Sequence, residues 1–102
     1  MNTREVREAA AAVEALHAIS WCLRALACGW SLDHRERTAA LTLLEAGIPG
    51  APAADLAAAT KILRSARRLG GRRREKASEL SVRLQAKAAE YFANLERQQL
   101  PR

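Results

Sequence analysis

The sequence is poor in aromatic residues and in cysteine. Its 102 residues include two Trp, one Tyr, one Phe and two Cys. Two cysteines are too few for a disulfide framework, and no stretch shows the alternation of β-branched and polar residues that is typical of a strand. These absences exclude a disulfide-stapled domain and leave the helix as the secondary structure that the chain favours.

Long apolar runs are also missing. The most apolar stretch, Ala18 to Trp30, has 13 residues and contains Arg24, whereas a membrane-spanning helix needs roughly 20 apolar residues. Arg4 and Glu5 lie in the N-terminal region, which therefore lacks the apolar core of a signal peptide. We expect a cytoplasmic protein that makes no membrane contact.

The sequence contains no recognisable catalytic, phosphate-loop or calcium-loop motif. The four residues that could bind a transition metal, His17, Cys22, Cys28 and His34, lie within eighteen positions, but their spacing matches no zinc signature. The carboxylates fall where solvated helix faces fall and form no acid–base pair. We therefore expect a protein that is not an enzyme and that holds no metal and no cofactor.

Strong helix formers such as Ala, Leu, Arg and Glu are abundant, and the start and stop signals between the helices are clear. Asp33 is a good N-cap with Glu36 three residues on as its reciprocal partner, and the run Gly47, Ile48, Pro49 ends a helix. The pattern predicts an all-α fold, a small antiparallel bundle of about four helices with a long last helix. In this single domain, residues 1–102, the expected helices are 3–27, 33–46, 52–69 and 72–99.

The apolar residues are mostly Ala, which buries little area per residue. We therefore expect the chain to gain stability by pairing with a second copy as a homodimer. Five large apolar residues are candidates for an oligomer or partner interface, and the alternative is that they close the core of the monomer: Trp21, Trp30, Tyr91, Phe92 and Leu95.

Positive charge is concentrated in residues 61–76, which we call the basic segment. It holds eight basic residues and one acid, a net charge of +7, whereas the whole chain carries +6. The remainder is therefore close to neutral, so that the charge forms a patch that indicates an anionic partner at one place. The basic residues are Lys61, Arg64, Arg67, Arg68, Arg72, Arg73, Arg74 and Lys76.

Arg72, Arg73 and Arg74 occupy the predicted start of the last helix, where the helix dipole disfavours cations. A bound phosphate would explain this placement, because helix-start N–H groups and guanidinium groups both bind phosphates. Gly70 and Gly71, which form either a turn or a hinge inside one long helix, would let the backbone approach the ligand closely. The hypothesis is a non-enzymatic protein that binds the phosphates of duplex DNA or structured RNA.

Other ligands are less well matched to the sequence. Single-strand binding would need aromatic residues among the basic ones, and none lies between Trp30 and Tyr91. Base reading by a helix-turn-helix would need polar side chains where residues 52–59 are mostly Ala. The alternatives that stay open are an acidic surface of a larger protein, with this chain as an interaction module or inhibitor, and a solvated basic turn. In its shortness and lack of catalytic residues, the chain is similar to small accessory proteins of phages and mobile elements.

Overall fold

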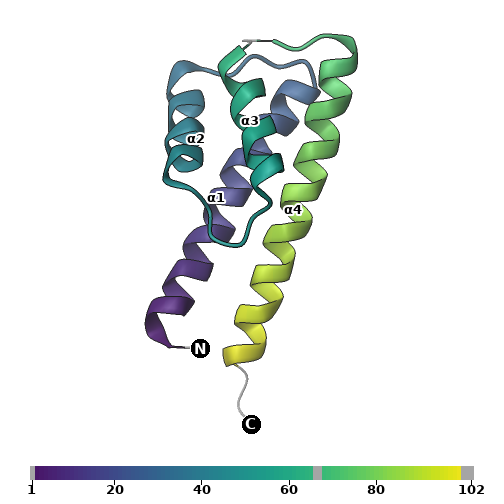
Figure 1. Cartoon of the computed structure of the whole chain (residues 1–102). Helices are drawn as coiled ribbons and strands as arrows, with labels where there is room; N and C mark the ends of the chain where they lie inside the picture. The colour runs from purple at the N-terminus through teal and green to yellow at the C-terminus, as the bar shows by residue number, and fades with distance from the viewer. Residues whose placement is uncertain (1, 66–67, 100–102) are drawn as a thin grey trace.

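The computed structural model describes residues 2–65 and 68–99, and these form four helices (Figure 1). The predicted all-α class is confirmed, and no strand occurs in the described residues. The helices are α1, Thr3–Ala27; α2, His34–Ala46; α3, Ala53–Ser65; and α4, Gly71–Gln99.

The two long helices, α1 and α4, form the spine of the molecule. They lie side by side, and the chain leaves along α1 and returns along α4, so that both termini lie at one end (Figure 1). The shorter helices α2 and α3 pack on one side of this pair, near the other end. The result is elongated, with extents of 50 × 21 × 21 Å.

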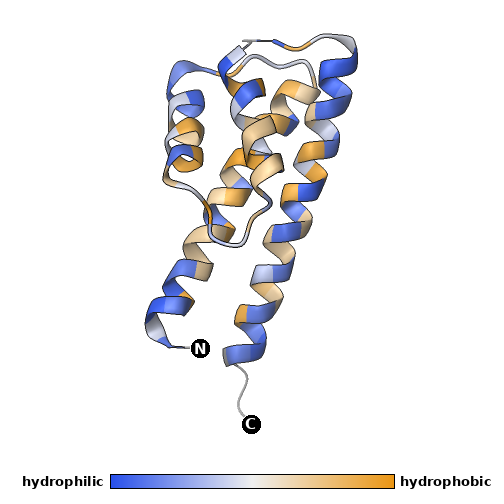
Figure 2. Ribbon diagram, viewed as in Figure 1, coloured by the Kyte–Doolittle hydropathy of each residue, from blue (hydrophilic) through white to orange (hydrophobic). Residues whose placement is uncertain are grey.

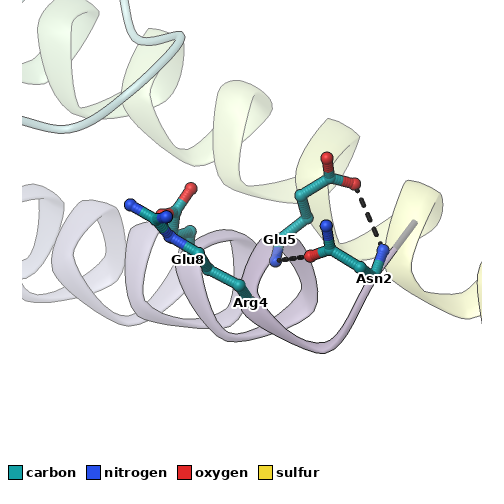
Figure 3. A network of polar contacts seen from close by, with 4 residues as sticks. All are labelled: Asn2, Arg4, Glu5 and Glu8. Carbon is teal, nitrogen blue, oxygen red and sulfur yellow. Dashed lines mark hydrogen bonds and ion pairs between the residues drawn. The ribbon is translucent and has the colours of Figure 1, made fainter.

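The first helix begins with a complete capping box, which Figure 3 shows. The Asn2 side chain accepts a hydrogen bond from the Glu5 backbone N–H at 2.9 Å, and the Glu5 carboxylate accepts one from the Asn2 backbone N–H at 3.3 Å. Arg4 and Glu8 form an exposed ion pair one turn further on, at 3.2 Å. The capping contacts satisfy N–H groups that the first turn leaves without helical partners.

The predicted boundaries of α2 match the structure closely. Asp33 accepts a hydrogen bond from the Glu36 N–H at 2.7 Å, although the reciprocal bond from the Glu36 side chain, expected from the sequence, is not formed. Gly47 ends the helix with a φ of 80°, a conformation that other residues adopt at a cost. Pro49 follows and prevents the helix from resuming.

The third helix is shorter than predicted, because α3 ends at Ser65 and not at residue 69. Residues 66 and 67 lie outside the described part of the chain. Leu69 is buried, but as a residue of the connection and not of a helix. Its side chain therefore contributes to the core from the connection. Apolar spacing in the sequence looks the same whether Leu69 belongs to one more turn of the helix or to a buried connection.

The core lies along α1, which contributes nine buried residues. Leu16, Ile19, Leu23 and Leu26 are fully buried in a cluster that also includes residues of the other helices, such as Leu63 of α3 and Leu84 of α4. By length and composition alone α1 could cross a membrane, yet 50% of its most apolar window is buried inside the protein. Packing within the bundle therefore accounts for much of its apolar character.

Two serines join α1 to α4 in the middle of this core. Ser20 and Ser81 are 0% and 3% exposed, and their hydroxyl oxygens lie 2.9 Å apart. Each hydroxyl can also donate to the backbone carbonyl of the other residue, at 3.2 and 3.1 Å. Such contacts require the two backbones to lie close together, and they set the register of α1 against α4.

We expect Ser81→Leu to destabilise the fold strongly, by about 1–3 kcal/mol or more, because the larger side chain must force the two backbones apart. Ser81→Ala, which removes the contacts of the Ser81 hydroxyl with the Ser20 hydroxyl and carbonyl, should cost about 1–2 kcal/mol. Urea unfolding followed by circular dichroism measures both changes. Ser31→Ala, at an exposed position, is the control, and an unaltered urea midpoint for Ser81→Leu would contradict the packing described here.

Candidate anion-binding site between α3 and α4

The basic segment lies at the end of the molecule opposite the termini. Its described residues belong to the C-terminal part of α3, to positions 68–70 and to the first turns of α4, and Figure 2 shows hydrophilic residues at the start of α4. Because α3 ends at Ser65 and α4 begins at Gly71, the paired glycines lie where the connection meets α4 and do not form a hinge inside one helix.

The start of α4 is open to a ligand. Gly71 has a φ of 45°, and the Arg73 N–H donates to the Gly70 carbonyl at 3.1 Å to form the first turn. A Cβ added to Gly70 or Gly71 would meet no atom within 4 Å. The two glycines therefore leave open space beside the start of α4, which a phosphate or a carboxylate could enter.

Three of the predicted cations bind groups of their own chain. Arg64 pairs with Glu45 at 3.3 Å, and both side chains are mostly exposed, so the pair contributes at most about 1 kcal/mol. Arg73 donates to the Ser65 hydroxyl. Arg74 Nε donates to the Leu69 carbonyl at 2.6 Å.

Arg74 also packs over the end of α1. A Cβ added to Gly29 would lie 2.9 Å from Arg74 Nη2, so the absence of a side chain there makes room for the guanidinium group. Gly29 has a φ of 84°, which independently favours glycine. Arg74 thus ties the connection to the end of α1, and we assign it a structural role.

Four of the predicted cations have no partner within the described part of the chain. Lys61, Arg68, Arg72 and Lys76 are exposed and form no hydrogen bond or ion pair with residues 2–65 or 68–99. Arg67 lies outside the described residues. Within the described part of the chain, the positive charge of the basic segment is therefore largely uncompensated by carboxylates of the same molecule.

Some of these residues line a groove between α3 and α4. It has a volume of about 490 Å³. Its lining combines apolar side chains and basic groups of both helices with one acid, Glu79. The lining residues are Ala58, Lys61, Ile62, Arg73, Lys76, Glu79, Leu80 and Arg83.

Arg83 was not predicted to belong to this site. Its Nε lies 3.3 Å from Asp55 Oδ1, at the start of α3. One signal could have identified it. Lys76 and Arg83 are seven residues apart, so they lie on the same face of α4 and extend the basic surface by two turns.

The predicted interface residues divide into two groups. Trp21, Trp30 and Phe92 are 56%, 60% and 53% exposed. Tyr91 is half-buried and donates to the Pro49 carbonyl at 2.9 Å, while Leu95 is buried. Tyr91 and Leu95 thus pack against their own chain, as the alternative interpretation of these residues expects.

The potential metal ligands do not come together. No three His, Cys, Asp or Glu side chains of the described residues are placed so that they could hold an ion. Cys22 is buried, whereas Cys28 is exposed. Burial, with smaller contributions from Glu36 and Asp33, raises the pKa of the Cys22 thiol, so this group is a poor nucleophile at neutral pH.

Comparison with protein-family models, curated proteins and solved structures finds no match for this chain. The geometry and charge of the α3–α4 end therefore carry the functional proposal.

We expect Gly71→Ala to lower the free energy of unfolding by about 1–2 kcal/mol, because an alanine at a φ of 45° is strained. Gly70→Ala is the matched control. Its site is equally open, and its φ is not positive, so we expect the free energy of unfolding to stay the same or to rise by up to about 1 kcal/mol. Urea unfolding of the two variants makes the comparison, and equal losses would show that the Gly71 backbone is not in this conformation.

Proposed function

We propose that this protein is non-enzymatic and binds the phosphate backbone of duplex DNA or structured RNA through the α3–α4 end. The observation that carries this proposal is the group of exposed cations without a partner in the described chain: Lys61, Arg68, Arg72 and Lys76. Arg72 lies in the first turn of α4 and Arg68 precedes that helix, whereas Lys61 and Lys76 line the groove between α3 and α4. The N–H groups of a helix start also favour an anion.

Some basic residues bind groups of their own chain and others do not, and this difference supports the proposal. Arg64, Arg73 and Arg74 are held by Glu45, by the Ser65 hydroxyl and by the Leu69 carbonyl, whereas Lys61, Arg68, Arg72 and Lys76 have no such partner among the described residues. Arg68 and Arg72 can bind phosphate oxygens in the bidentate manner that guanidinium groups allow. The lysines of the groove, Lys61 and Lys76, add point charges on its two sides.

The surface is better suited to contact the sugar-phosphate backbone of a nucleic acid than to read its bases. The side chains that line the groove include no Asn and no Gln, the usual partners of adenine. Binding of this kind is electrostatic, with dissociation constants of roughly 10⁻⁴ to 10⁻⁶ M at physiological salt.

We also propose that the four helices form an antiparallel bundle and that the chain acts as a homodimer. The connections between successive helices have six, six and five residues, and short connections favour antiparallel neighbours. The exposed Trp21 and Phe92 support a second copy on the long helices.

A pair of triple variants tests the nucleic-acid proposal. Lys61→Gln/Arg72→Gln/Lys76→Gln removes three charges at the α3–α4 end, and Arg4→Gln/Arg7→Gln/Arg97→Gln removes three at the opposite end. Each lowers the net charge from +6 to +3. In anisotropy titrations on duplex DNA and on duplex RNA, we expect the first triple to reduce the slope of log K against log salt by about 3 and the second to leave it nearly unchanged.

The matched net charge makes this comparison decisive. Equal weakening by both triples would mean that the whole surface attracts the nucleic acid and that no site exists at the α3–α4 end. No binding of the wild-type protein to either duplex at low salt would remove the nucleic-acid proposal altogether.

A second candidate function is an interaction module or inhibitor that takes an acidic amphipathic helix of a larger protein. The observation that favours it is the apolar part of the groove, formed by Ala58, Ile62 and Leu80, which phosphates would not use. A helix with an apolar stripe and flanking carboxylates would bury its stripe there and place its acids beside Lys61 and Lys76.

Ile62→Asn separates the two candidates, because it changes the apolar surface and keeps every charge. If the partner is a helix, Ile62→Asn and Lys61→Gln should each reduce capture of a protein partner from nuclease-treated extracts of the native cells by about tenfold or more, a change of about 1.4 kcal/mol. If the partner is nucleic acid, Lys61→Gln should weaken duplex binding and Ile62→Asn should not. A partner protein that is retained equally by both variants would exclude the groove as its binding site.

A further inference from the structure

An apolar surface remains uncovered on the two long helices. Three large side chains are exposed there: Trp21 of α1, and Val82 and Phe92 of α4, with Val82 62% exposed. On α1 the exposed positions of this surface recur at alternating steps of three and four, the spacing of a helix seam that packs on another helix. They are Ala10, Glu14, His17, Trp21 and Arg24, and Cys28, directly after the end of α1, continues the spacing.

A matching seam runs along α4. Its exposed residues are Ser78, Val82, Ala89 and Phe92, which again recur at helical spacing. These four residues are apolar or small, and the half-buried Gln85 occupies the same row between Val82 and Ala89. We call the two rows together the outer seam.

The contact between Ser20 and Ser81 shows that both rows lie on the same side of the helix pair. One residue further along each helix, Trp21 and Val82 are turned by about 100° from the two serines. Because α1 and α4 run in opposite directions (Figure 1), these two turns lead to the same side. On the opposite side of the helix pair, rotated the other way about each helix axis from the two serines, lie Leu16 and Leu84. These two residues are buried in the core against α2 and α3.

We propose that a second copy of this chain packs on the outer seam, with the two α1 helices antiparallel about a two-fold axis level with Ile19. The proposal gives the homodimer of the previous section a surface and a register. Ile19 lies midway between Glu14 and Arg24, so each Glu14 faces Arg24 of the other copy. Neither side chain forms an ion pair with the described residues of its own chain.

The other residues of the α1 seam are complementary under the same symmetry. His17 faces Trp21 of the second copy, where two flat rings can stack, and Ala10 faces Cys28, where both side chains are small. Pairs of this kind alternate along an antiparallel helix pair as the two seams interdigitate. Charge, shape and spacing on α1 therefore agree on one register.

The fourth helix supports the same axis independently. Ser20 lies opposite Ser81, and residue numbers run in opposite directions along α1 and α4, so the residue of α4 level with Ile19 is Val82. Val82 is the most exposed large apolar side chain among the described residues. An axis chosen only from the charges on α1 thus brings Val82 of one copy against Val82 of the other.

Sedimentation equilibrium over a range of protein concentrations tests the surface. We expect the wild-type protein to approach 22.4 kDa, twice its mass of 11.2 kDa, and Trp21→Glu and Val82→Glu to remain at the monomer mass with unchanged helical circular dichroism. Trp30→Glu is the matched control, because Trp30 is as exposed as Trp21 but follows α1 and lies off the seam.

Two outcomes would overturn the surface: a wild-type protein that stays monomeric at every concentration, or a Trp30→Glu variant that dissociates as completely as Trp21→Glu. The duplex titration described above changes no residue of the outer seam. Its outcome is therefore independent of the sedimentation result, and the nucleic-acid proposal can fail while the dimer surface holds, or the reverse.

The register has its own test. Glu14→Arg should raise the dimer dissociation constant at least tenfold. The double variant Glu14→Arg/Arg24→Glu should return this constant to the wild-type value, because exchanging the two charges re-forms both ion pairs. Under mild oxidation, Ala10→Cys should give a covalent dimer through Cys28, whereas Ala11→Cys, one step around the helix, should not. Failure of the swap to restore the dimer, or equal cross-linking of the two cysteine variants, would overturn the antiparallel register.

Discussion

The close contact of α1 with α4 at Ser20 and Ser81 is the constraint on which the other features depend. Small side chains let the two backbones approach, and the paired hydroxyls fix how far one helix is shifted along the other. With that register set, one side of the pair presents Leu16, Leu23 and Leu84 to α2 and α3, and they become the core. The other side keeps its own apolar row and receives no helix from the described part of the same chain.

The same packing decides which basic residues are free. Arg74 is anchored because the end of α1, with Gly29, lies beside the start of α4, and Arg64 reaches Glu45 because α2 and α3 are neighbours. No comparable acceptor among the described residues pairs with Arg68 or Arg72. Arg72 lies at a helix start, where cations are disfavoured by the dipole and by one another, so local stability offers no reason for its placement.

Much of this fold could be predicted from the sequence because its signals are local. Asp33 caps α2 and Gly47 ends it through contacts within a few residues. The end of α3 could not be predicted, since Leu69 is buried by the tertiary fold and not by a further helical turn. The same limit explains Arg83, whose partner Asp55 comes from another helix. On α4, apolar spacing alone could not decide that Leu95 faces inward and Phe92 outward.

The length of the first part of α4 has a consequence for how a paired molecule could engage a duplex. Gly71, where the helix starts, precedes Val82 by eleven residues, which is about 16 Å at a rise of 1.5 Å per residue. A two-fold axis at Val82 would therefore separate the two helix starts by about 33 Å. One pitch of B-form DNA is about 34 Å, so the pair could straddle a single helical period and grip the backbone at two successive crossings.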